Sequence, residues 1–206
     1  MYYLVLVPAL LMAVTFHEYA HARTALAFGD RTAYERGRVS LNPFVHLDPI
    51  GTLMLLLVGF GWGKPVPVTR SALRYPRADL WVSAAGPLAN LALAWAAGLT
   101  VRFGLLPDDG ATGFAGWIRL LIPMLVYLNV SLAVFNLLPV GALDGVHVLE
   151  NLLPAPAAAS FHQFNRTFGL LLLIFLLLSP RLFHVNPLAV LLETPTAFLG
   201  ELFLGR

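Results

Sequence analysis

The sequence contains no cysteine among its 206 residues. Disulfide bonds, thiolate metal ligands and cysteine nucleophiles are therefore all excluded. Any metal ion must be bound by histidine, aspartate or glutamate, which are the other common protein ligands.

Charged residues are scarce, at 12% of the sequence against 58% hydrophobic residues. An ordinary soluble domain carries about 25% charged residues. Apolar runs such as 2–16 and 170–178 leave too little polar surface for a water-soluble particle, so the lipid bilayer is the expected surroundings. The net charge of +2 comes from short basic clusters between apolar segments. That pattern is typical of membrane-protein loops, so no nucleic-acid partner is expected, and the oligomeric state is left open.

The sequence predicts an all-α polytopic membrane protein with about five or six transmembrane or half-spanning helices. Residues 50–60 are apolar but too short to span, which predicts a re-entrant loop. The alternation at 37–41 predicts a short cytoplasmic β-hairpin, and the Ala- and Pro-rich segment 152–160 predicts a loop. Glu193 and Pro195 predict that the last segment lies on the membrane or forms a broken helix. Spanning or apolar segments are expected at 2–28, 79–101, 117–138, 168–178 and 187–204.

The whole chain, 1–206, is predicted to be one intramembrane domain, with a core at about 1–150 and C-terminal membrane segments at 165–206. Two segments, 31–38 and 64–77, hold seven of the thirteen basic residues. The positive-inside rule places them in the cytoplasm and the loop 107–116, which has no basic residue, outside. A multi-pass protein of the cell membrane is therefore expected.

The strongest motif is His17-Glu18-Tyr19-Ala20-His21, an H-E-x-x-H within a predicted helix. Residues four apart lie on one helix face, so His17 and His21 can bind one Zn²⁺. Glu18 lies beside that face and can act as a general base on water at the metal. Three ionisable residues inside an apolar segment cost several kcal/mol unless they are paired or functional. The motif lies ~22 Å along a helix that crosses a core of ~30 Å, which places it within the membrane toward the cytoplasmic side.

Two further stretches accompany this motif: Asn136-Leu137-Leu138-Pro139-Val140-Gly141-Ala142-Leu143-Asp144-Gly145 and Gly86-Pro87-Leu88-Ala89-Asn90. Together with H-E-x-x-H they resemble the N-x-x-P-x-x-x-L-D-G and G-P-x-x-N patterns of the site-2 protease family of intramembrane zinc metalloproteases. The resemblance covers about residues 10–150. It suggests a minimal member, without a PDZ domain or a nucleotide-binding regulatory domain.

The resemblance implies that Asp144 is the third zinc ligand. This agrees with the usual coordination of catalytic zinc, which has three protein ligands and one open position. Competing third ligands are Glu150, His147, His46 and Asp48. The resemblance also suggests that Asn90 and Asn136 hold substrate backbone or steady the oxyanion. Hydrogen bonding between helices explains these two asparagines equally well.

The implied reaction is the hydrolysis of a peptide bond in a transmembrane segment of another membrane protein. His17, His21 and Asp144 would bind zinc, and Glu18 would move the proton. The alternatives are a zinc-binding membrane transporter and a non-catalytic scaffold. A transporter needs polar residues across the whole bilayer, whereas the sequence has one cluster at one depth. A scaffold has no need of Glu18.

Overall fold

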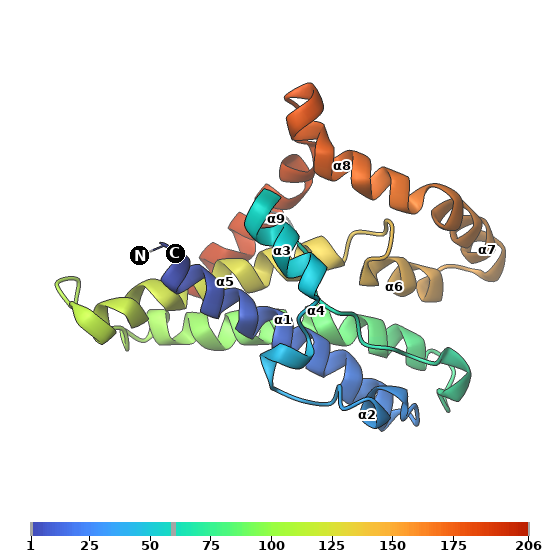
Figure 1. Ribbon diagram of the computed structural model, residues 1–206, viewed down its shortest axis with the longest axis horizontal. Helices are drawn as coiled ribbons and strands as arrows, with labels where there is room; N and C mark the ends of the chain where they lie inside the picture. Colours follow the sequence, from blue (N-terminus) through green and yellow to red (C-terminus); the bar gives the residue numbers. More distant parts are fainter. Residues whose placement is uncertain (1, 59–60, 206) are drawn as a thin grey trace.

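The computed structural model describes residues 2–58 and 61–205 and is built from helices (Figure 1). Three long helices, α1, α4 and α5, pack against one another, and α9 packs against α4 and α5. The long helices are α1 (Tyr2–Ala27), α4 (Ala78–Arg102), α5 (Gly113–Asn136), α8 (Leu170–Phe183) and α9 (Pro187–Leu204). The shorter elements are α2 (Thr32–Glu35), η1 (Pro43–Val45), α3 (Pro49–Val58), η2 (Arg70–Ala72), α6 (Asp144–Leu152), α7 (Ala155–Phe164) and the π-helical turn η3 (Asn165–Gly169).

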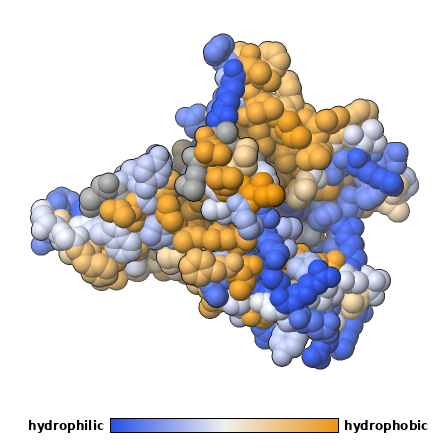
Figure 2. Space-filling model, in the orientation of Figure 1, coloured by the Kyte–Doolittle hydropathy of each residue, from blue (hydrophilic) through white to orange (hydrophobic). Residues whose placement is uncertain are grey.

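Five helical stretches are long and apolar enough to cross a membrane, the continuous run Ala155–Phe183 counting as one. This confirms the predicted all-α membrane fold. Small and β-branched residues such as Ala9, Ala94 and Val130 form the core where α1, α4 and α5 meet, whereas large apolar side chains point outward. Hydrophobic side chains cover α3 and α8, and hydrophilic ones gather around α2 (Figure 2). An outside more apolar than the core is what a lipid solvent allows.

The predicted β-hairpin is wrong, because the described residues contain no strand. Gly37 ends α2 with a positive φ of 67°. Its N–H donates to the carbonyl of Tyr34, and the N–H of Arg38 donates to that of Ala33. These two bonds form a Schellman motif, so the glycine stops a helix and does not turn a hairpin. One isolated antiparallel bridge, between Leu47 and Gly63, pairs the segment before α3 with the segment after it.

Two further predictions about the second half of the chain need correction. The predicted loop 152–160 contains α7, because Pro154 and Pro156 lie at the helix start, where a missing N–H costs nothing. Of the two alternatives for the last segment, the broken helix is wrong, because α9 runs unbroken through Pro195 from Pro187 to Leu204.

The predicted half-crossing segment 50–60 is the ten-residue helix α3. At 1.5 Å per residue it is about 15 Å long, half of a bilayer core. Residues 59 and 60 of that prediction lie outside the described residues.

Candidate active site

Helix α1 and the start of α6 bring together three side chains that could hold a metal ion. His17 and His21 lie one turn apart on α1, and their Nε2 atoms are 3.1 Å from each other. Asp144, the first residue of α6, places its Oδ2 3.1 Å from the Nε2 of His17 and 3.2 Å from that of His21. Both histidines are buried, and the Oδ2 of Asp144 is buried without a hydrogen-bond partner.

The protonation of the imidazoles explains why that oxygen lacks a partner. The Nδ1 of His21 is 2.7 Å from the carbonyl oxygen of Val82, which can only accept, so Nδ1 carries the proton. The Nδ1 of His17 likewise donates to the Oδ1 of Asn90 at 2.7 Å. In the neutral rings both Nε2 atoms then present lone pairs to a carboxylate oxygen. Three facing acceptors repel one another unless a cation lies among them.

The spacing of these three atoms fits zinc. Tetrahedral ligands at 2.0–2.1 Å from a zinc ion are about 3.3 Å apart, and the three atoms here are 3.1–3.2 Å apart. Among the described residues this is the group of three or more His, Asp or Glu side chains that could hold a metal ion. Two imidazoles and one carboxylate at the wall of a cavity are a donor set that would suit a hydrolytic zinc ion.

Gly86 on α4 makes room for both imidazoles. A Cβ atom built there would lie within 2.7 Å of the Nε2 and Cε1 atoms of His17, and closer still to the Nε2 of His21. Real Cβ atoms do not approach other atoms so closely. The motif G-P-x-x-N therefore begins with a glycine because α4 passes directly behind the two histidines.

Asn90, one turn beyond Gly86, is fully buried and has protein partners on both ends of its amide. Its Oδ1 accepts from His17, and its Nδ2 donates to the carbonyl oxygen of Ala13 and to the Oδ1 of Asn129. Asn129, also fully buried on α5, donates in turn to the carbonyl of Leu125. This chain of amides fixes the orientation of His17. Asn129 was not predicted from the sequence, although an amide within an apolar helix was a usable signal.

Glu18 faces the same space from the flank of the helix. Its Oε2 accepts a hydrogen bond of 3.0 Å from the backbone N–H of Val66. Glu18, Asn136, Asp144 and both histidines line a cavity of about 330 Å³. Asn136 also donates from its Nδ2 to the carbonyl of Leu132, one turn earlier on α5. Asn90 does not line this cavity.

The segment that carries Val66 is held over the cavity by two buried groups. Asp30, directly after α1, accepts from the N–H and hydroxyl of Thr32 and from the N–H of Thr69 at 2.5–2.8 Å. Burial alone would raise the pKa of Asp30, but these hydrogen bonds outweigh it and lower the pKa below its ordinary value of 3.8. Arg38, buried near Glu18, donates to the carbonyl of Lys64.

None of the four competing third ligands belongs to the group formed by His17, His21 and Asp144. His46 is fully buried and its Nε2 donates to the carbonyl of Ser40. Asp48 caps α3 by accepting from the N–H of Gly51. His147 lines the cavity and belongs with Glu150 to a polar cluster. In this cluster Arg70 contacts Asp79, His147 and Glu150, and His162 contacts Glu150. Burial alone would raise the pKa of Glu150, but the hydrogen bonds from His162 and His147 outweigh this effect and lower the pKa below its ordinary value.

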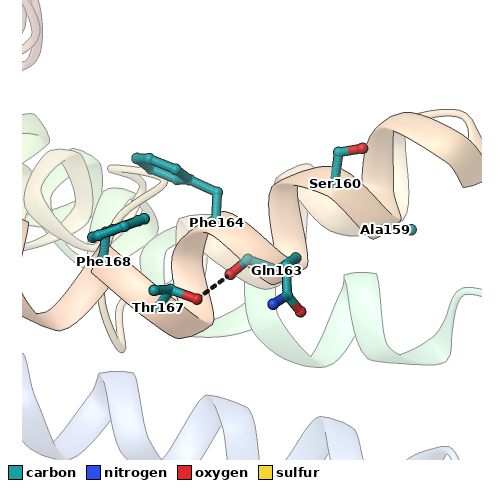
Figure 3. A pocket seen from close by; sticks show the side chains of 6 residues that line it. All are labelled: Ala159, Ser160, Gln163, Phe164, Thr167 and Phe168. Carbon is teal, nitrogen blue, oxygen red and sulfur yellow. Dashed lines mark hydrogen bonds between the residues drawn. The ribbon is translucent and has the colours of Figure 1, made fainter.

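A larger hollow of about 660 Å³ follows one side of α7 and η3 (Figure 3). Its lining comes from a single continuous helix, from Ala159 to Phe168, so it is an open surface. No imidazole or carboxylate lines it, whereas both kinds of group line the smaller cavity.

Comparison with known proteins shows to which family the chain belongs. YwhC of Bacillus subtilis (strain 168), which carries the provisional name of a zinc metalloprotease, is 40% identical over 182 residues, covering 85% of this chain and 80% of the relative. The sequence model of peptidase family M50 matches residues 103–178. The chain belongs to this family, the site-2 proteases.

Rip2 of Mycolicibacterium smegmatis, with the same provisional name, is a second relative of this family: it is 32% identical over 186 residues, covering 87% of this chain and 69% of the relative. No solved structure matches the chain. Membership of M50 confirms the predicted family, a zinc metallopeptidase of the intramembrane, site-2 protease type, with zinc as its cofactor. Nothing in these comparisons favours the transporter or the scaffold.

Proposed function

We propose that His17, His21 and Asp144 bind the catalytic zinc of this M50 protease and that Glu18 is its general base. The observation that carries the proposal is the triangle of three facing acceptor atoms beside the Glu18 carboxylate, at the wall of one cavity. When bound, zinc acts as a Lewis acid that activates water and polarises the scissile carbonyl.

The substrate we propose is a transmembrane segment of another membrane protein, unwound locally so that one peptide bond reaches the cavity. Glu18 removes a proton from the attacking water, whose oxygen joins the carbonyl carbon. The C–N bond then breaks, and Glu18 delivers the proton to the leaving amine nitrogen. The Val66 N–H holds the carboxylate that performs both transfers.

The two asparagines take different roles in this proposal. Asn90 orients His17 through the hydrogen bond to Nδ1, as partners of metal-bound histidines commonly do. Asn136 lines the cavity, so its amide is available to contact the substrate backbone or the developing oxyanion.

We further propose that the protein is a multi-pass protein of the cell membrane with its cavity toward the cytoplasm, and that its 206 residues act as one domain. Arg70, from one of the two basic segments, lines the cavity, and Arg38 of the other lies near Glu18. The positive-inside rule supports a cytoplasmic position for that end of the bundle.

The decisive experiment compares the wild type with Glu18→Gln in detergent. Zinc per chain is measured by elemental analysis, and cleavage of a single-pass test substrate by mass spectrometry of the fragments. We expect about one zinc in both proteins, cleavage by the wild type alone, and a cut inside the apolar segment. Chelation should abolish cleavage and added zinc should restore it. Equal cleavage by Glu18→Gln would refute the assignment of the base, and a chain without zinc would refute the ligands.

A further inference from the structure

The loop that carries Asp144 into the site is held by a side chain from a different part of the chain. Residues 137–143 connect α5 to α6, and Gly141 lies near their end, three positions before Asp144. The Oδ1 of Asn165 accepts from the N–H of Gly141 at 2.9 Å, and the Nδ2 of Asn165 donates to the carbonyl of Gly141 at 2.9 Å. One amide side chain therefore pairs with both polar groups of one loop residue.

The backbone around this pair is built to let it form. Asn165 begins η3, a π-helical turn of the sort that is frequent at functional sites. Gly169 ends that turn, and a Cβ atom there would collide with the Asn165 side chain and lie 3.0 Å from the N atom of Gly141. Gly141 itself has φ of 65° and lies against Leu173, whose Cβ would be 3.1 Å from an added Cβ. The fit therefore depends on two glycines and an uncommon helical turn.

The rest of the contact between loop and helix is apolar. Val140 and Leu143 pack with Leu173 of α8 in a small cluster apart from the main core. Apolar side chains allow sliding between similar packings, whereas two directional hydrogen bonds allow one register. The Asn165 amide thus fixes where the loop ends, and the loop ends at Asp144.

We propose that Asn165 is a positioning residue for Asp144. By holding Gly141, Asn165 sets the distance between the Asp144 carboxylate and the two imidazoles. The inference rests on the proposed function in taking Asp144 as a zinc ligand. Metal sites tolerate deviations of only about 0.2 Å in the distance between ligand and metal. If the loop shifted by about 1 Å, most of the bond between Asp144 and zinc would therefore be lost.

The test measures zinc affinity by competition with a chromophoric chelator, which does not depend on catalysis. We expect Asn165→Ala to weaken zinc binding about 10-fold, as loss of an outer partner commonly does. Gly141→Ala, which strains the same contact from the loop side, should do likewise. The matched control is Thr167→Ala. Thr167 is exposed on the same helix, and its hydroxyl donates to the carbonyl of Gln163, as Figure 3 shows. The zinc affinity of this variant should equal that of the wild type.

A double-mutant cycle separates positioning from general loosening of the fold. Because Asn165 acts through Asp144, adding Asn165→Ala to Asp144→Ala should cause no further loss of zinc affinity. Wild-type affinity in Asn165→Ala, or a further 10-fold loss in the double variant, would overturn the positioning role while Asp144 remains a ligand. Wild-type affinity in Asp144→Ala would instead overturn the ligand assignment and the proposed function with it. Circular dichroism of each variant establishes that it is folded.

Discussion

Replacing Asp30 with asparagine tests how the segment over the cavity is anchored. The substitution keeps the shape of the side chain, and its amide oxygen can still accept from Thr32. Its NH₂ group, however, would face the N–H of Thr69, which now donates to a carboxylate oxygen at 2.6 Å. A hydrogen bond to a charged group contributes about 1.5–3 kcal/mol, and a buried donor left without a partner costs about 1–3 kcal/mol. We expect Asp30→Asn to lower the free energy of unfolding by about 3 kcal/mol at pH 7.

The pH dependence of this loss gives a sharper result than its size. A carboxylate with a lowered pKa in the folded state stabilises fully above its ordinary pKa of 3.8, and that stabilisation is lost as the pH falls through the lower folded value. The difference in melting temperature between wild type and Asp30→Asn should therefore be large at pH 7 and shrink well below pH 4.

The assay is thermal unfolding in detergent, followed by circular dichroism at both pH values. Glu35→Gln is the matched control, because Glu35 is an exposed carboxylate 3.9 Å from Arg31 and such surface pairs contribute little. An unchanged difference between wild type and Asp30→Asn at pH 3 and pH 7 would refute the reasoning. It would mean that the charge of Asp30 does not hold the segment.

Three other predictions concern the metal site and its orientation in the membrane. Gly86→Ala should lower zinc affinity by more than about 10-fold, because the new methyl group overlaps both imidazoles, while Gly110→Ala, with open space around it, should have no effect. Asn90→Ala should weaken zinc binding by about 10–100-fold, measured by chelator competition, because the Nδ1–H it accepts from loses its partner; an unchanged affinity would contradict the role of orienting that imidazole. Because the chain has no cysteine, Arg36→Cys and Asp108→Cys each introduce a single thiol. In intact cells a membrane-impermeant maleimide should label the thiol at position 108 and not the one at position 36. Labelling at position 36 alone would mean that the topology is inverted.

The parts of the fold that sequence reasoning predicted are those set by local pattern. A run of apolar residues as long as the bilayer is thick is a helix wherever it occurs, because every backbone polar group must be satisfied within lipid. The bounds of α1 and α4 accordingly differ from prediction by a residue at each end at most, and those of α5 by two to four residues. The spacing of His17 and His21 needed only the geometry of one helical turn.

The parts that escaped prediction depend on partners distant in the chain. Gly37 is the exception, because it is compatible with a hairpin turn and with a helix end, and the nearby carbonyl groups of Ala33 and Tyr34 decide between them. The Val66 N–H reaches Glu18 across 48 positions, and no local periodicity records that pairing. Asn129 was missed for the same reason, since its role exists only where α4 and α5 meet.

The distance along the chain between the groups that make up the metal site has a consequence for biosynthesis. The two histidines leave the ribosome first, Asn90 follows 73 residues after His17, and Asp144 comes later still. A nascent chain therefore offers two imidazoles long before it offers the carboxylate. Zinc that meets such a chain finds an incomplete set of ligands, so a hydrolase can form only after three long helices have been inserted and assembled. With the proposed ligands, the order of the residues thus delays the chemistry until the protein is built.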